Sequence, residues 1–300
     1  MSVYNEEDTL RETIDSVLQQ EGVDFEFIVV DDGSTDASGA ILKEIAQHDS
    51  RLIVLHQSNQ GITKALINGC EHANAKFIAR QDAGDLSLPG RLKSQLSLLT
   101  NTSDAVLCST GTRYVSDQGE TVIEASIDSR QANDGLRPTT AEDLAGPTHH
   151  GCVMFRKKSY VQCGGYRAEF KVAQDLDLWT RMIELGSHVV LPQIFYQAVL
   201  RPNAISATQR GRQEIARRLI FQCIQQRAAS GSDATALSSI ATQLSTPSSD
   251  GKRSAIEYDY FIGSLLAQTG SKKCRAYFMR VIANRPWHVK AWYKLFKSYL

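Results

Sequence analysis

Two spacings of apolar residues alternate along the first hundred residues of the chain. In residues 10–18, apolar side chains recur every three or four positions, which predicts a helix with one buried face and an N-cap at Asn5. The continuous apolar run at 25–30 predicts a buried strand. The succession repeats, with strands expected at 52–55 and 77–79 and helices expected through 41–45, at 62–72 and after Pro89. Helices and strands that take turns predict a parallel sheet covered by helices.

The sheet should begin with a strand, yet only Met1 to Tyr4 precede the first predicted helix. The letters SVY are typical of the last residues of a strand. Either the first strand is cut short, or the natural chain starts upstream of Met1, and we favour the second explanation.

The second half of the chain is less regular. The pattern predicts a strand at 106–108, a hairpin at 112–122, a strand at 153–156, a helix from Gln174 and two short strands at 189–191 and 195–200. We expect this α/β domain to span residues 1–208. An α-helical extension should follow at 209–300, with a flexible segment near 228–254 that is rich in Ser, Thr, Ala and Gly. The last helix, after Pro286, resembles half of a helical-hairpin repeat.

Composition narrows the class of protein. Lys plus Arg and Asp plus Glu number 33 each, so no overall positive field attracts nucleic acid, and we expect no nucleic-acid partner. The six cysteines lack zinc-site spacing and are expected to be reduced. The N-terminal residues do not resemble a signal peptide, and there is no run of about 18 apolar residues. We therefore expect a cytoplasmic protein.

Acidic residues follow two of the predicted strands. Asp31 and Asp32 end the run at 25–30 and lead into the turn GSTD, while Asp82 and Asp85 follow the strand at 77–79. Ligands of parallel sheets bind beyond the carboxyl ends of strands, and carboxylate oxygens suit Mg²⁺ or Mn²⁺. Each motif alone is equally compatible with a plain turn, a helix cap or a solvated acidic loop.

Two further segments carry candidate chemistry. Asp175 and Asp177 lie at the start of a predicted amphipathic helix, where a carboxylate could serve as a general base or simply favour the helix dipole. His149 and His150 precede a strand and could contact phosphate or an acceptor, although such a pair is more often structural.

Taken in order, these segments resemble glycosyltransferase family 2, inverting nucleotide-sugar-dependent enzymes with a GT-A fold. The resemblance covers about residues 2–205 and is far more specific than any single motif. It is carried by VYNEE (3–7), VVDDGSTD (29–36), NQGITKALING (59–69), ARQDAGDLSLPGRL (79–92), HHGCVMFR (149–156), GGYR (164–167) and AQDLDLWTRM (173–182).

The resemblance implies a Rossmann-like mixed sheet flanked by helices and a role for several residues. Asp175 matches the catalytic base, which deprotonates an acceptor hydroxyl as it attacks the anomeric carbon. Asp82 matches the first acid of the DxD signature and, with Asp85, would bind Mg²⁺ or Mn²⁺. The remaining nucleotide-sugar residues would be Tyr4, Glu6, Asp32 and Lys64.

The resemblance also sets the expected substrates and leaves alternatives. We expect a UDP-linked donor, with dTDP- and GDP-linked sugars as alternatives. The resemblance implies a glycan or lipid-linked acceptor in surface polysaccharide biosynthesis, and we expect peripheral association with the inner face of the membrane. The family pattern D-A-D-D is D-A-G-D here, so Gly84 replaces the usual direct metal ligand. A non-catalytic GT-A-like binding module is therefore an alternative. A nucleotidyltransferase is a third possibility, but the acidic NEEDTL segment disfavours it.

Overall fold

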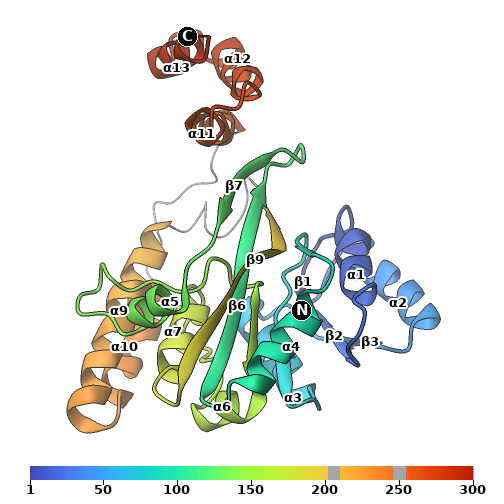
Figure 1. The fold of residues 1–300 in the computed structure, drawn as a ribbon, viewed down its shortest axis with the longest axis vertical. Coiled ribbons are helices and arrows are strands. Elements are labelled where there is room, and N and C mark those ends of the chain that lie inside the picture. Colours follow the sequence, from blue (N-terminus) through green and yellow to red (C-terminus); the bar gives the residue numbers. More distant parts are fainter. Residues whose placement is uncertain (202–209, 246–254, 300) are drawn as a thin grey trace. The chain divides into compact units, whose positions relative to one another are not determined.

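The computed structural model describes residues 1–201, 210–245 and 255–299 (Figure 1). Contacts divide the chain into two compact units. The larger unit contains Met1–Thr112, Ser126–Ala198 and Arg212–Pro247, and the smaller unit contains Arg113–Ala125, Val199–Gly211 and Ser248–Leu300. Residue 208, the predicted end of the first domain, lies outside the described residues, so a division at that point stays a prediction.

The N-terminal part of the larger unit is a parallel sheet with the order β1-β2-β3. Its strands are β1 (Ser2–Val3), β2 (Phe27–Asp31) and β3 (Leu52–His56). All five residues of β2 are buried, as the continuous apolar run predicts. The first strand is short, as expected, yet its two residues pair in register with β2.

The helices of the larger unit largely follow the predicted periodicity. The first begins at Leu10, and its predicted apolar positions Leu10, Ile14 and Val17 are buried. The described helices are α1 (Leu10–Leu18), α2 (Ser38–His48), α3 (Ile62–His72), α4 (Arg91–Asn101), α5 (Ser129–Leu136), α6 (Lys157–Gln162), α7 (Gln174–Met182), α9 (Arg210–Ser230) and α10 (Ala234–Ser245).

The prediction that Asn5 caps the first helix is wrong. Asn5 has φ 53°, and the helix begins at Leu10 with Thr9 at its N-cap. The Asn5 side-chain oxygen instead accepts a hydrogen bond from the Thr35 backbone N–H at 2.8 Å, and the Asn5 N–H donates to Ser34 Oγ at 3.1 Å. Asparagine tolerates this left-handed conformation, so Asn5 fastens the loop that follows β2.

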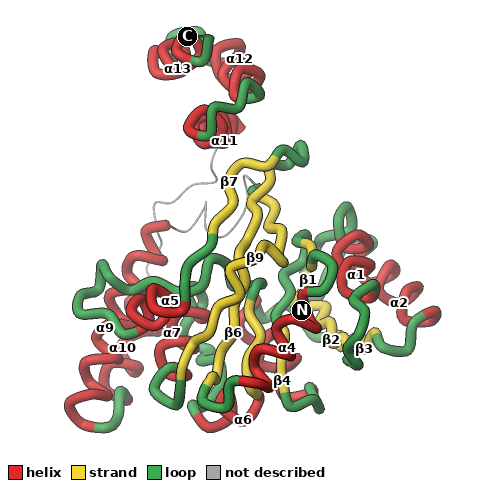
Figure 2. Tube along the Cα trace, in the orientation of Figure 1, coloured by secondary structure: helices red, strands yellow, loops and turns green. Residues whose placement is uncertain are grey.

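The second sheet is largely antiparallel and has the order β4-β8-β6-β9-β5, with β7 paired to β6 (Figure 2). Its strands are β4 (Phe77–Ala79), β5 (Leu86–Ser87), β6 (Ala105–Val115), β7 (Thr121–Ala125), β8 (Val153–Arg156) and β9 (Ser187–Val199). The two short strands predicted at 189–191 and 195–200 are one strand, β9, because Pro192 and Gln193 interrupt only the apolar pattern. The parallel arrangement is therefore correct for β1 to β3, whereas β4 with β8, β6 with β8 and β5 with β9 pair antiparallel, so the architecture is mixed.

The prediction of a loop throughout 228–254 is wrong for its first part. Helix α9 continues to Ser230, and α10 occupies Ala234–Ser245. Ile240 and Leu244 are buried in one core cluster with Ile220 of α9. The Ser, Thr and Ala residues that suggest a linker surround a few apolar residues at helical spacing, and packing decides the structure. Residues 246–254 lie outside the described part of the chain.

The smaller unit combines the β7 strand with three helices, α11 (Ala255–Gln268), α12 (Cys274–Asn284) and α13 (Val289–Lys297). Their core includes Ile262, Phe278 and Leu295, and Val122 of β7 belongs to the same cluster. Tyr258 Oη donates to the Leu200 carbonyl at 2.8 Å and accepts the Asp117 N–H at 3.0 Å, so the helices are tied to the hairpin that leads into β7.

The burial of Ile240 gives a test of the helix at 234–245. We expect Ile240→Ala to lower the free energy of unfolding by about 2–5 kcal/mol, because it leaves a cavity in a packed cluster. Ser238→Ala on the exposed face of the same helix is the control and should change stability by less than about 0.5 kcal/mol. Urea unfolding measures both, and equal small effects would show that this segment does not pack.

Candidate active site

Asp32 organises the loop between β3 and α3. Its carboxylate is 2% exposed and accepts hydrogen bonds from the backbone N–H groups of Gln60 at 2.9 Å and Gly61 at 2.8 Å, and from the Gln57 side chain at 2.7 Å. Lys64, in the first turn of α3, is exposed, and its ammonium lies 3.4 Å from Gln60 Oε1. The structure thus brings Asp32 and Lys64 to one loop at the carboxyl end of the parallel sheet.

Two other predicted nucleotide-sugar residues lie at the same sheet edge. Tyr4 directly follows β1, is 48% exposed, and neighbours Asp32, whose N–H donates to the Val3 carbonyl at 2.9 Å. Glu6 lies at the entry to α1, where its carboxylate accepts from Thr9 Oγ1 at 3.2 Å and its N–H donates to Ser38 Oγ at 2.9 Å. Glu6 therefore also shapes the turn that leads into α1.

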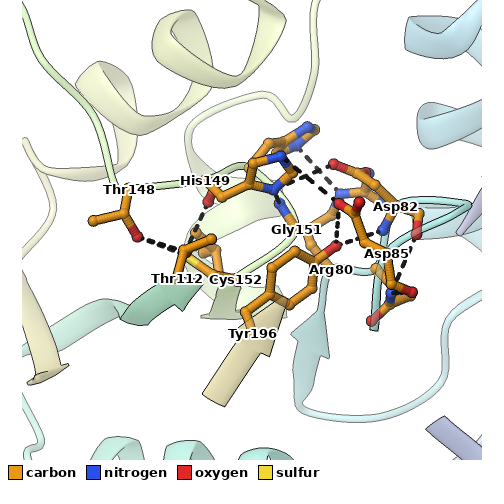
Figure 3. Close-up of polar contacts among 12 residues, drawn as sticks. Arg80, Asp82, Asp85, Thr112, Thr148, His149, Gly151, Cys152 and Tyr196 are labelled. Atoms are coloured by element: carbon orange, nitrogen blue, oxygen red, sulfur yellow. Dashed lines mark hydrogen bonds and ion pairs between the residues drawn. The ribbon is translucent and has the colours of Figure 1, made fainter. Parts of the chain in front are cut away.

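The acidic loop after β4 folds around the hydroxyl of Tyr196, a residue of β9. Tyr196 Oη accepts the Asp82 N–H at 3.1 Å and donates to Asp85 Oδ2 at 3.0 Å. His149 stacks on the Tyr196 ring with centroids 5.3 Å apart. Figure 3 shows these side chains directed toward one another. Gly151 makes the arrangement possible, because a Cβ at this position would lie 1.9 Å from the Tyr196 oxygen.

Asp82, Asp85 and His149 form a group with metal-ligand geometry. One ligand atom from each lies within 4.8 Å of the others. His149 Nδ1 is 3.8 Å from Asp82 Oδ2, and His149 Nε2 is 3.7 Å from Asp85 Oδ2. The sequence motif predicts Asp82 and Asp85 as metal ligands, whereas His149 is predicted only as a contact for phosphate or an acceptor, because it lies some 65 residues further along the chain. Its position directly before a buried strand was the available signal.

Arg80 sets the charge of this group. Its guanidinium lies 2.6 Å from Asp82 Oδ1. Burial alone raises the pKa of Asp82, but Arg80 and the neighbouring histidines outweigh it and hold that pKa at about 2. Arg80 Nε also lies 3.2 Å from His150 Nε2, which is 2.8 Å from Tyr166 Oη. Burial, aided by Arg80, lowers the pKa of His150 to about 4, so its imidazole is neutral at pH 7.

A second arginine, Arg91, holds the loops in place. It is 1% exposed, and its guanidinium donates to the carbonyls of Arg80 at 2.7 Å and Gly151 at 2.6 Å. It also donates to Ser87 Oγ at 2.8 Å and lies 4.9 Å from the Tyr196 ring centroid. Arg91 thereby joins the loop that carries Asp82 to the loop that carries His149.

The structure separates the roles of the two aspartates at the start of α7. Asp177 is fully buried, and its carboxylate lies 2.6 Å from Arg181 and 3.6 Å from Arg167. Asp175 is half-buried and acts electrostatically on His150, where it opposes the lowering of the pKa. Asp175 therefore borders the same charged group as Asp82, whereas Asp177 is part of the packing of α7.

Most of these elements lie in a part of the chain that matches a known protein family. A model of Glycosyl transferase family 2 matches residues 1–162. The chain belongs to glycosyltransferase family 2. The curated relatives include the putative glycosyltransferase EpsE of Bacillus subtilis, 35% identical over 62% of this chain and 66% of its own length. The amylovoran biosynthesis glycosyltransferase AmsE of Erwinia amylovora is 30% identical over 65% of this chain and 72% of its own length. The chain thus spans about two thirds of the length of EpsE.

Solved structures support the GT-A fold for this glycosyltransferase. Residues 1–349 of TarS from S. aureus, in complex with UDP, superpose with a TM-score of 0.54 at 18% identity, covering 99% of this chain and 87% of that chain. The mannosyltransferase PcManGT of Pyrobaculum calidifontis, in complex with GDP-Man and Mn²⁺, gives a TM-score of 0.56 at 17% identity, covering 99% and 82% of the two chains. The predicted α/β fold with C-terminal helices is confirmed. Among the described helices, none has both the length and the hydropathy that a membrane span requires.

The contrast between Asp175 and Asp177 gives a second prediction. Asp177→Asn should lower the free energy of unfolding by about 3–5 kcal/mol, because it leaves Arg181 buried without its anion. Asp175→Asn at the half-buried neighbouring position should change stability by less than about 1 kcal/mol. Urea unfolding of both variants measures the difference, and a reversed order would assign the structural role to Asp175.

Proposed function

We propose that this glycosyltransferase transfers a sugar from a nucleoside diphosphate donor to an acceptor hydroxyl with inversion at the anomeric carbon. The observation that carries the proposal is the common charged group of Arg80, His150 and Asp82, which Asp175 also borders. The Asp82 carboxylate is thus available to a cation on the leaving diphosphate, and the Asp175 carboxylate is available to the acceptor hydroxyl. An attack opposite the leaving group requires a base and a diphosphate site of this kind on the two sides of the sugar.

Asp175 is the proposed general base. It lies in the first turn of α7 and directly follows Gln174, a buried residue at the start of the helix. In the proposed step, Asp175 accepts the proton of the acceptor hydroxyl while that oxygen bonds to the anomeric carbon. The bond from that carbon to the diphosphate oxygen breaks, and the nucleoside diphosphate leaves.

The donor pocket is proposed at the edge formed by Tyr4, Glu6, Asp32 and Lys64. Tyr4 offers an exposed ring for a base, and Lys64 offers an exposed ammonium near the loop that Asp32 holds. TarS binds UDP and UDP-GlcNAc, and PcManGT binds GDP-Man, each according to its structure's description. These complexes support a nucleotide-sugar donor, and we favour a UDP-linked sugar.

The residues present fit a divalent cation, and we propose Mg²⁺ or Mn²⁺. Asp82 and Asp85 offer oxygen ligands, and His149 offers a nitrogen ligand in place of the carboxylate that is missing at Gly84. A cation held here would neutralise charge that grows on the departing diphosphate. The chain's own contribution is to keep Asp82 ionised through Arg80 and to orient Asp85 through Tyr196.

The acceptor and the setting rest on the family alone. We propose a glycan or lipid-linked acceptor in cell-surface polysaccharide biosynthesis, because AmsE is named for the biosynthesis of such a polymer. We further propose a cytoplasmic enzyme that associates peripherally with the inner face of the membrane.

Nucleoside diphosphate release tests the proposed reaction. We expect the protein to release a nucleoside diphosphate from one nucleotide sugar of a panel that covers UDP-, GDP- and dTDP-linked donors, in the presence of Mn²⁺. Asp175→Asn should lower the rate about 10²- to 10⁴-fold, because it removes the general base while the donor still binds. Donor binding by calorimetry is the control. Donor binding without any turnover by the wild type would instead favour a non-catalytic binding module.

The proposed metal site gives a separate prediction. His149→Ala should raise the Mn²⁺ concentration needed for half-maximal release by about 10- to 100-fold, because one ligand is lost and the acidic loop stays in place. His72→Ala, at an exposed position on α3, is the matched control. Metal titration of the release rate measures both, and an unchanged requirement in His149→Ala would remove His149 from the site.

A further inference from the structure

The charges of this chain are unevenly distributed. The whole sequence is neutral, but residues 271–300 contain eight Lys and Arg and no Asp or Glu. Within this segment, residues 274–297 form α12, α13 and the connection between them. Some of these cations are engaged within the bundle, since Arg280 pairs with Asp259 at 2.8 Å and Lys294 donates to Ser264 Oγ at 2.8 Å. Lys290 and Lys297 are exposed on α13.

The same segment exposes large apolar side chains. Trp287 is 78% exposed, Tyr293 is 66% exposed and Phe296 is 65% exposed. Val289, Tyr293 and Phe296 recur at helical spacing on one face of α13, while Ala291 and Leu295 of the same helix face the core of the smaller unit. Exposed clusters of aromatic residues on this scale mark an interaction surface.

The contacts of Trp292 suit an interface that is apolar on one side and charged on the other. The Trp292 indole N–H donates to the Pro286 carbonyl at 2.8 Å, so its ring can leave water without losing a hydrogen bond. The Trp292 and Phe296 rings stack with centroids 5.9 Å apart. A cavity of about 440 Å³ lies beside this segment, lined by Ile256, Glu257, Tyr260, Phe261 and Ser264 of α11 and by Arg285, His288 and Lys294.

We propose that the basic aromatic face, formed by Trp287, Lys290, Tyr293, Phe296 and Lys297, docks on the surface of an anionic lipid bilayer. Aromatic rings would enter the headgroup region, and the lysines would contact lipid phosphates, which is the pattern of helices that lie in a membrane interface. The excess of positive charge over this segment is the complement of such a surface. The inference names the surface for the peripheral association proposed above, and it does not depend on the identity of the sugar donor.

Vesicle binding tests the proposal with the full chain. We would measure co-sedimentation and tryptophan emission with vesicles of phosphatidylcholine alone and with 30 mol% phosphatidylglycerol added, in low and high salt. Two of the three tryptophans, Trp287 and Trp292, lie in this segment, whereas Trp179 is fully buried elsewhere. We expect binding to the anionic vesicles, a blue shift of emission, and at least about tenfold weaker binding in high salt.

Paired variants separate the two contributions. Tyr293→Ser with Phe296→Ser should abolish the binding, and Lys290→Glu with Lys297→Glu should reduce it at least about tenfold. The control carries Val161→Ser and Lys158→Glu on α6, where one exposed apolar residue and one exposed lysine lie in the larger unit. Nucleoside diphosphate release without vesicles should be unchanged in all of these variants. Absence of release from the wild type would count against the proposed reaction and not against the lipid-binding surface.

Two results would overturn the inference. The first is equal binding to neutral and anionic vesicles, or none to either. The second is a concentration-dependent dimer of the wild type that the Tyr293→Ser, Phe296→Ser variant abolishes, because the face would then bind a second copy of the chain.

Discussion

The candidate site depends on one buried cation, Arg91. Its guanidinium is almost inaccessible to water and makes its hydrogen bonds to carbonyl, amide and hydroxyl oxygens of the surrounding loops. Burial lowers the pKa of this group, as expected when a charge is moved out of water. Such a charge is tolerated only where its donors are satisfied, so the loops must adopt the conformation that surrounds it. Those loops carry Asp82, Asp85 and His149.

This constraint explains how a site with an unusual acidic motif keeps its geometry. Gly84 takes a left-handed conformation, φ 88°, and its N–H donates to Thr13 Oγ1 at 3.0 Å. The loop therefore turns so that Asp82 and Asp85 both reach the Tyr196 hydroxyl. Arg80 then compensates one of the two carboxylates, so the group of Asp82, Asp85 and Arg80 has a net charge near −1. We infer that a cation bound here is held less by charge than by the arrangement of three ligand side chains.

Local patterns in the sequence predicted most elements of the fold. The helix at 62–72 and the strands at 77–79 and 153–156 have the predicted bounds, because each is a strongly patterned segment whose own residues decide its structure. The helix at 234–245 was not predicted, since its stability comes from packing against α9 and not from its composition. The antiparallel pairing in the second sheet was also not predictable, because pairing between strands that are distant in the sequence leaves no local pattern.

In the site, too, residues within local motifs could be predicted, whereas residues whose roles depend on distant contacts could not. Asp82, Asp85 and Asp175 could be selected because each lies at the end of a strand or the start of a helix within a recognisable motif. His149, Tyr196, Arg80 and Arg91 could not be assigned, because their roles arise from contacts across up to 114 residues of chain, such as that between Asp82 and Tyr196. The difference between Asp175 and Asp177 likewise needs the positions of Arg167 and Arg181.

In the proposed reaction, the bond between the anomeric carbon and the diphosphate of a nucleotide sugar breaks while the diphosphate lies beside Asp82, Asp85 and His149. Its most direct test is a crystal structure of the protein with UDP and Mn²⁺, with data collected to locate manganese by anomalous scattering. We expect an anomalous peak in contact with these three side chains and with the diphosphate oxygens, and we expect the uracil ring near Tyr4 and Asp32. A nucleotide bound with its diphosphate and metal away from these residues would contradict it.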